Sequence, residues 1–188
     1  MRLRLLCCFY IFSMVLFSQE KSDLPYYEVP VYPDEFTAGT MASRMVDALG
    51  FRFYWATEGL TETDLDYKPT ADNRSARETI DHILGLSNII VNSTLKKPNS
   101  QEKNDLSFAE TRAKILNNLK TAADILRVSE DISQFRIIFG ENEIPFWNQV
   151  NGPIADAIWH CGQLAIYRRT TDNPINPKVN HFTGKVRN

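Results

Sequence analysis

Apolar residues recur at helical spacing in four separate segments of this 188-residue chain, and no segment of any length alternates between apolar and polar residues as a half-buried strand would. The four predicted helices cover approximately residues 37–58, 75–97, 107–126 and 151–169. A helix with one apolar face must bury that face against another element, so the pattern predicts an all-α fold, a four-helix bundle. Because the connection between the last two helices is long, simple up-down-up-down topology does not follow from the pattern.

Capping residues indicate where these helices begin and end. Ser75 is followed three residues later by Glu78, and Ser107 is followed in the same way by Glu110. This spacing is that of a capping box, in which each side chain accepts a hydrogen bond from the backbone N–H group of the other residue. Gly59 is a typical stop signal for the first predicted helix. The sequence therefore indicates where the first helix ends and where the second and third begin.

The first 18 residues are typical of a secretory signal peptide. Two arginines precede a mostly apolar run over residues 5–17, and polar residues follow. This run is too short for a comfortable bilayer span, so we predict that the protein is exported to the periplasm or the extracellular space. The alternative is an uncleaved segment that anchors the protein in a membrane.

The rest of the chain divides into an arm, a bundle domain and a tail. Residues 19–36 contain prolines among tyrosines, which predicts an extended arm that lies on the domain surface and outside the core. Residues 37–170 form the predicted bundle, in which residues 131–147 are an aromatic-rich crossing with space for a short hairpin. Residues 171–188 form a predicted irregular tail, in which we expect His181 to be exposed.

Composition and charge exclude some classes of function. The formal net charge of −2 provides no basic field for nucleic acid, and 43% hydrophobic residues are ordinary for a soluble domain. Once the predicted signal peptide is removed, Cys161 is the only cysteine, so no internal disulfide can form. We interpret Cys161 as a small buried apolar residue, with a reactive or metal-binding thiolate as the alternative. The oligomeric state stays open, although bundles of this size commonly form a homodimer through an outer helix face.

Asp156 and His160 lie four residues apart on the apolar face of the last predicted helix. At this spacing two side chains stack one turn apart, so the pair can hydrogen-bond internally or bind one cation together. An unpaired carboxylate on an apolar face would cost several kcal/mol to bury, so Asp156 needs a partner. His82 lies in the middle of the second predicted helix, and a lone histidine there is most often a satisfied polar residue at the edge of a core.

Two segments carry a resemblance to a known family. The second-helix sequence SARETIDHIL, residues 75–84, resembles the DinB-like (YfiT-like) superfamily, and so does the fourth-helix sequence WHCGQLA, residues 159–165. The segment from Gly59 to Pro69 is also similar, and the resemblance covers roughly residues 37–170. It implies a four-helix bundle in which three histidines hold a divalent metal ion, one from the second helix and two from an HxxxH pair on the fourth.

In this resemblance His82 matches the first metal ligand of the family and His160 matches the last, but the middle position is Asp156 instead of histidine. One interpretation is a site of two histidines and one carboxylate, which suits a divalent ion such as Zn, Ni, Mn or Fe and leaves coordination positions open. The donor set does not decide which metal is bound. The other interpretation is that this branch has lost tight metal binding.

Three more polar residues are candidates around these ligands. Glu78 lies one turn before His82 and is a reserve ligand, although we favour its role in the capping box. Asp81 and Gln163 are weaker candidates for orienting a ligand ring by a hydrogen bond to its other nitrogen, and each is otherwise a solvated or bundle-facing polar residue.

Two functions from different classes follow. The first is a metal-dependent enzyme, because the resemblance implies thiol-dependent transferases and hydrolases, and predicted export favours hydrolase-like chemistry over a thiol cofactor. The sequence contains no nucleophile elbow or phosphate loop, so the catalytic residues and the small-molecule substrate stay unidentified. The alternative is a non-catalytic module that binds metal or a small ligand, with the aromatic residues of 135–147 and Trp159 as a pocket floor. A metal-free structural bundle is the third option.

Overall fold

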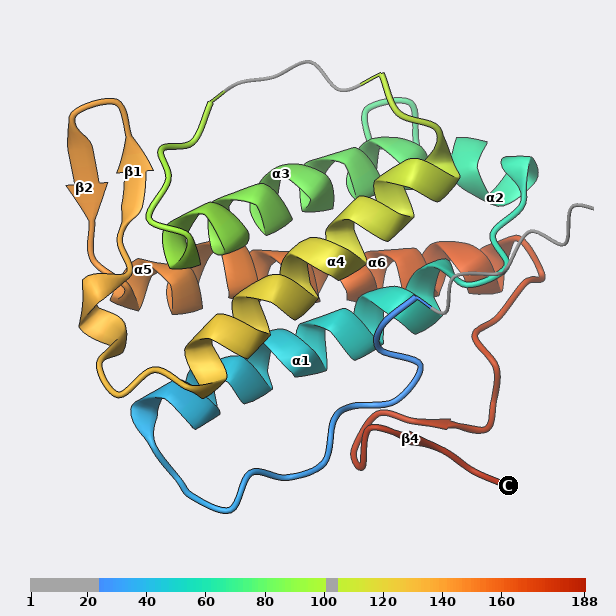
Figure 1. Ribbon diagram of the computed structural model, residues 1–188. Coiled ribbons are helices and arrows are strands. Elements are labelled where there is room, and N and C mark those ends of the chain that lie inside the picture. Colours follow the sequence, from blue (N-terminus) through green and yellow to red (C-terminus); the bar gives the residue numbers. More distant parts are fainter. Residues whose placement is uncertain (1–23, 101–104) are drawn as a thin grey trace, which may run out of the picture.

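The computed structural model describes residues 24–100 and 105–188, so the predicted signal peptide lies outside the described residues. The protein is mostly helical, and its long helices pack side by side as a helical bundle (Figure 1). The long helices are α1 (Ala38–Thr57), α3 (Ala76–Thr94), α4 (Phe108–Arg127) and α6 (Ala155–Thr170). None of the helices in the described part combines the length and the apolar character that a bilayer span requires.

Shorter elements occupy the connections between the long helices. They are α2 (Glu62–Asp66), the 3₁₀ turn η1 (Ile132–Gln134), α5 (Trp147–Gln149) and the π-helical turn η2 (Val150–Ile154). The predicted hairpin is confirmed as the antiparallel strands β1 (Ile137–Phe139) and β2 (Asn142–Ile144). A second antiparallel pair in the tail joins β3 (Val179–Asn180) to β4 (Lys185–Val186).

The capping predictions for the long helices are confirmed. The Ser75 and Glu78 side chains accept each other's backbone N–H groups at the start of α3, and Ser107 and Glu110 do the same at the start of α4. Gly59 follows α1 with a φ of 70°, a left-handed conformation that glycine adopts without strain. The spacing of Thr61 and Asp64 likewise predicts the capping box that begins α2, and the structure adds one for α1.

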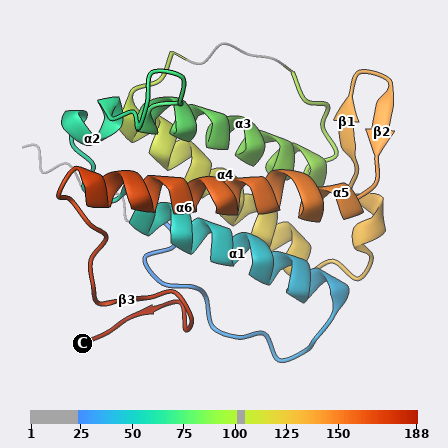
Figure 2. The same ribbon diagram turned by 180° about the vertical axis from the view of Figure 1, so that it is seen from behind.

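The helices are not arranged in the order in which the chain visits them. The principal contacts join α1 to α4, α4 to α3, α3 to α6 and α6 back to α1. Figures 1 and 2 show that α1 and α6 run in one direction and that α3 and α4 run in the other. The neighbours α3 and α4 are therefore parallel, and α4 begins at the end of the bundle opposite to the end of α3. This arrangement places α6 directly beside α3, the two helices that carry the candidate ligands.

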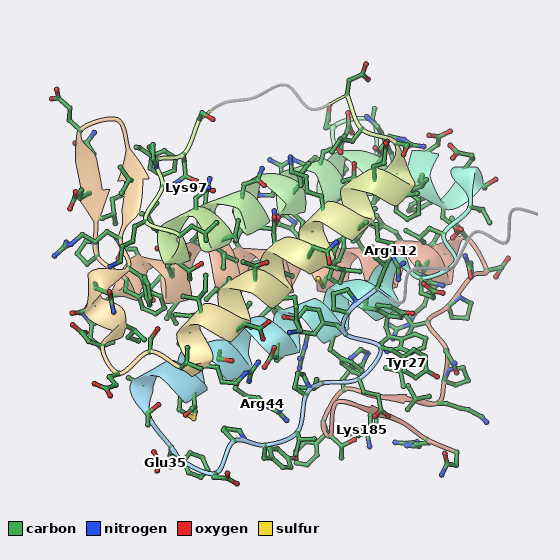
Figure 3. All side chains as sticks on the ribbon, viewed as in Figure 1. Tyr27, Glu35, Arg44, Lys97, Arg112 and Lys185 are labelled. Carbon is green, nitrogen blue, oxygen red and sulfur yellow. The ribbon has the colours of Figure 1, made fainter. Side chains whose placement is uncertain are left out.

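The core lies between these four helices. Its largest side chains with almost no exposed surface include Leu49, Phe53, Ile80, Ile83, Ile115, Leu116, Leu119, Leu126 and Ile154. At one end of the bundle the guanidinium group of Arg112 joins α4 to α1, because it pairs with Glu58 at 2.6 Å and lies over the ring of Tyr54 (Figure 3). The apolar stripes predicted from the sequence are thus the faces that meet.

The prediction that the arm stays outside the core is wrong at two residues. Tyr26 is only 4% exposed and belongs to the main core cluster, and Val29 packs against Phe51 and Trp55. The ring of Tyr26 occupies the space above Gly50, where an added Cβ would lie 2.4 Å from it. A missing side chain on α1 therefore lets an aromatic residue of the arm enter the core, which composition alone could not reveal.

The arm and the tail also hold each other. The Val29 backbone N–H donates to the Gly184 carbonyl oxygen at 2.9 Å, and Lys185 pairs with Glu28 at 2.8 Å. Tyr27 and Lys185 are labelled on this side of the molecule in Figure 3, and the Trp55 indole N–H donates to the Tyr27 carbonyl oxygen at 3.1 Å. His181 is exposed in this tail, as predicted.

The last helix begins earlier than predicted. The sequence predicts a helix that starts at about residue 151, but α5, η2 and α6 follow one another directly from Trp147. Gly152 has a φ of −97° and a ψ of −105°, outside helical values, so the path is kinked there. Because proline donates no backbone hydrogen bond, Pro153 fits this loosened π-helical turn, and the regular helix starts at Ala155.

Candidate metal centre

Three residues predicted as ligands converge where α3 lies beside α6. His82 comes from α3, and Asp156 and His160 come from α6. Each offers one ligand atom, and the three atoms lie within 4.8 Å of one another. The Asp156 carboxylate reaches both imidazoles, with Oδ2 at 3.0 Å from His82 Nε2 and Oδ1 at 3.3 Å from His160 Nε2.

Local structure explains this convergence. Asp156 and His160 are one turn apart on α6, so their side chains share a face of that helix. His82 lies next to the fully buried Ile83, at the edge of the α3 stripe that faces the core. The two histidine rings meet edge to face with their centroids 4.7 Å apart. The site is therefore built by the packing of two regular helices, a more rigid support than a loop.

Exposure differs among the three side chains. The His160 side chain is 11% exposed, that of His82 is 31% exposed, and that of Asp156 is 42% exposed. The histidine on α6 is thus the innermost group, and the carboxylate lies toward solvent. A cation bound here would have protein ligands on its inner side and space for water or another ligand on its outer side.

Gln163 lies behind the ring of His160. His160 Nδ1 is 2.8 Å from Gln163 Oε1, so the tautomer with its proton on Nδ1 donates a hydrogen bond to this amide oxygen. In that tautomer Nε2 carries a lone pair and faces Asp156 Oδ1 at 3.3 Å. A cation between these two atoms, either a proton on the ring or a metal ion, makes the contact favourable.

The other two candidates are placed outside the cluster of ligand atoms. Glu78 accepts a hydrogen bond from the Ser75 backbone N–H at 2.7 Å and pairs with Lys68 at 3.0 Å. These interactions, the backbone hydrogen bond first, hold the pKa of Glu78 below its usual value. Asp81 is exposed beside His82, and partial burial raises its pKa. The capping role favoured for Glu78 therefore agrees with its contacts, whereas Asp81 faces a neighbouring groove.

This groove, of about 770 Å³, runs along the outward side of α3. It begins at Asp81, His82 and Gly85 and extends to Phe139 on β1. Four amide side chains line it: Asn88, Asn92, Asn99 and Asn118. The sequence analysis missed these residues, because they come from two helices and a connecting segment and form no motif. Only the spacing of four between the first two could have indicated a shared helix face.

Two predictions about other side chains have mixed outcomes. Among the aromatic residues of 135–147, Phe135 and Phe146 are buried in the core, while Trp147 is exposed, as is Trp159. Of these aromatic residues, Phe139 alone lines the groove, so the predicted aromatic floor does not form. Cys161 is buried as expected, and burial raises the pKa of its thiol to about 12, which opposes a thiolate role.

No family model, curated protein or solved structure matches this chain. The chemistry that this site can support is therefore inferred from its donor atoms and their geometry.

Proposed function

We propose that the protein is an exported DinB-like four-helix bundle in which His82, Asp156 and His160 hold a divalent metal ion that serves a hydrolytic reaction. The observation that carries this proposal is the convergence of three ligand atoms, one each from His82, Asp156 and His160, within 4.8 Å of one another. The order of the family-like segments along the chain supports the family proposal.

The donor set fits such an ion chemically. Two imidazole nitrogens and a carboxylate are established ligands for first-row divalent metals, and the exposed side of the cluster leaves positions for water and substrate. When bound, the ion supplies a Lewis acid and lowers the pKa of a coordinated water. Gln163 keeps the ring of His160 in the tautomer that presents Nε2, which is the usual work of a residue behind a metal ligand.

The groove beside His82 gives the proposed reaction a place for its substrate. Its amide side chains offer neutral donors and acceptors beside the charged side chains of Asp81, Lys97 and Lys114, and Gly85 leaves space one turn from His82, because a Cβ there would meet no atom within 4 Å. A polar substrate bound along α3 would therefore reach the cluster from its exposed side. A transferase that uses the same ion to polarise a carbonyl or a thiol fits the same geometry.

A non-catalytic metal-binding module is the second candidate. In the described part of the chain, no acid or histidine joins His82, Asp156 and His160 in the cluster of ligand atoms. A proton acceptor for bound water would then have to come from Asp81 in the groove or from the substrate. Binding without turnover is the expected behaviour if neither supplies it.

Metal content separates these proposals from a metal-free bundle. Protein purified without an affinity tag is expected to contain about one divalent ion per chain by elemental analysis, and His160→Ala is expected to contain almost none. His181→Ala is the matched control, because it removes an exposed histidine in the tail, outside the cluster. If the wild type and His160→Ala hold the same negligible amount, the carboxylate and the ring share a proton and the metal proposal is wrong.

Activity then separates enzyme from module. The metal-loaded protein is assayed against panels of esters, amides and phosphoesters, and hydrolysis is expected to disappear in His82→Ala. Hydrolysis that survives this substitution would locate the chemistry elsewhere. A metal-loaded protein with no turnover on any panel would support the module. Replacing Asp156 with histidine restores the ligand set implied by the family resemblance, and unchanged metal affinity would show that Asp156 is not a ligand.

A further inference from the structure

A second cavity, of about 600 Å³, lies between α1, α6 and the C-terminal tail. Figure 2 shows the tail leaving the end of α6 and returning past α1. The lining residues of α6 are on a different face from Asp156, His160 and Gln163, so this cavity is separate from the candidate metal centre. Its volume is in the range of small-molecule sites.

Two arginines and one histidine, from three different elements, line this cavity. Arg52 comes from α1, Arg169 from the last turn of α6, and His181 from the tail. No acidic side chain is among the described lining residues. Arg52 donates to the Ala48 carbonyl oxygen at 3.1 Å, within its own helix. In the described part of the chain, arginines such as Arg112 and Arg127 form ion pairs with carboxylates, but Arg52 and Arg169 do not. Two guanidinium charges thus share a cavity that contains no counter-charge in the described part of the chain.

His181 contributes an aromatic ring to the cavity and little positive charge. The His181 ring lies edge to face with Phe51, with centroids 5.7 Å apart. Burial lowers the pKa of His181, and the nearby charge of Arg52 lowers it further. Both effects favour the neutral imidazole, which offers one donor and one acceptor. The positive charge of the cavity comes from Arg52 and Arg169.

The other walls are mostly apolar, with the uncharged amide of Asn176 as their polar group. They include Ala56, Ile158, Cys161, Ala165, Ile166, Ile175, Pro177 and Val179. Gly162 lines the same cavity, and a Cβ added there would meet no atom within 4 Å, so the backbone of α6 leaves open space at this point. Apolar walls beside unpaired cations are complementary to a molecule that has an anionic head and an apolar body.

We propose that this cavity binds an amphipathic organic carboxylate, with its head between Arg52 and Arg169 and its chain along Ile158 and Ile175. Guanidinium groups match a carboxylate geometrically, since their planar N–H groups can donate two parallel hydrogen bonds. The apolar walls exclude a ligand whose whole surface is charged, such as a polyphosphate. This proposal is independent of the metal ion, and it holds whether or not His82 and His160 bind one.

Calorimetric titration with decanoate tests the proposal. The wild type is expected to bind it, and Arg52→Gln and Arg169→Gln are each expected to weaken binding tenfold or more. Arg74→Gln is the charge-matched control, because Arg74 is exposed and lies outside the cavity, and it is expected to bind as the wild type does. Decanol, which has the chain without the charge, and butanoate, which has the charge with a short chain, are both expected to bind much more weakly.

Gly162→Leu tests the cavity without changing charge. The new side chain extends into the open space and leucine has a higher helix propensity than glycine, so the variant is expected to fold and to lose decanoate binding. The proposal is overturned if the wild type shows no binding up to about 1 mM decanoate. It is also overturned if both arginine variants bind as the wild type does, or if decanol or butanoate binds as tightly as decanoate. His82→Ala is expected to keep decanoate binding, which makes this outcome independent of the metal proposal.

Discussion

The two faces of α6 carry opposite chemistry within sixteen residues. On the face toward α3, Asp156 and His160 present two ligand atoms that converge with that of His82. On the face toward α1 and the tail, Arg169 joins Arg52 in a cavity without a described acid. The difference teaches that a bundle helix can serve two unlike ligands at once, because the core separates its faces and each face takes its partners from a different neighbour.

Removing the hydrogen-bond acceptor of the His160 ring should weaken metal binding and leave decanoate binding unchanged. Gln163→Leu is expected to lower metal affinity by about 10- to 100-fold, since the His160 ring loses the hydrogen bond that fixes its tautomer. Gln163→Glu keeps an acceptor there and serves as the matched control. Competition with a fluorescent chelator measures the metal affinity, and decanoate titration of the same variants should be unchanged. A fall in both affinities would show that the two faces are coupled.

Loosening the contacts at the C-terminal end of α6 should affect the cavity between Arg52 and Arg169 more than the candidate metal centre. Asp64 on α2 is buried and accepts hydrogen bonds from the Thr171 hydroxyl, the Asn173 amide and the Thr61 backbone N–H. Burial alone would raise the pKa of Asp64, but these hydrogen bonds lower it to about 2. The ionised form is thus stabilised in the folded state, and this contribution, about 2 kcal/mol, is present above pH 4 and lost as the pH falls through about 2.

Asp64→Asn is therefore expected to lower the free energy of unfolding by about 2 kcal/mol at pH 7, with the deficit shrinking toward pH 2. Urea denaturation at several pH values measures it. Asp66→Asn, an exposed acid on the same short helix, is the control and should leave stability almost unchanged. A constant deficit at all pH values would contradict the assignment. Decanoate binding should weaken more than metal binding, because Thr171 and Asn173 begin the tail that closes the cavity.

The smallest effect concerns two glycines in helices. Gly85→Ala is expected to raise the free energy of unfolding by about 0.5–1 kcal/mol, because its Cβ meets no atom and alanine favours the helix. Gly50→Ala gains the same propensity but should destabilise the fold, since its Cβ would lie 2.4 Å from the Tyr26 ring. Thermal denaturation distinguishes the two. Equal shifts in one direction would show that the arm does not pack as described.

Much of the helical structure could be predicted because its signals are local. The capping boxes formed by Ser75 with Glu78 and by Ser107 with Glu110 indicate where α3 and α4 begin, and the apolar stripes indicate which helix faces are buried. The positions of His82, Asp156 and His160 on their helices followed from the same periodicity. That the three side chains meet required the packing of α3 against α6, which the family resemblance implied and the residues alone did not.

What could not be predicted depends on contacts between distant segments. Pro153 has the pattern of a first-turn proline, and nothing local distinguishes that from a π-helical turn within a longer helix. Tyr26 lies in a proline-rich arm, and its burial depends on the missing side chain of Gly50. Arg52 and Arg169 are 117 positions apart, so their shared cavity appears only once α1, α6 and the tail are placed.

The π-helical turn before Asp156 gives the chain a place where one residue can be lost without moving either face of α6. Each residue of an α-helix advances the side chains by about 100° around the axis. A π-helical turn spreads a similar sweep over one more residue, so deleting one residue from Val150–Ile154 would leave α6 in almost the same register against α3. Deleting Ala157 instead, within regular helix, would turn His160 and Arg169 by about 100° relative to Asp156. The two ligand faces of α6 therefore tolerate a length change before Asp156 and not after it.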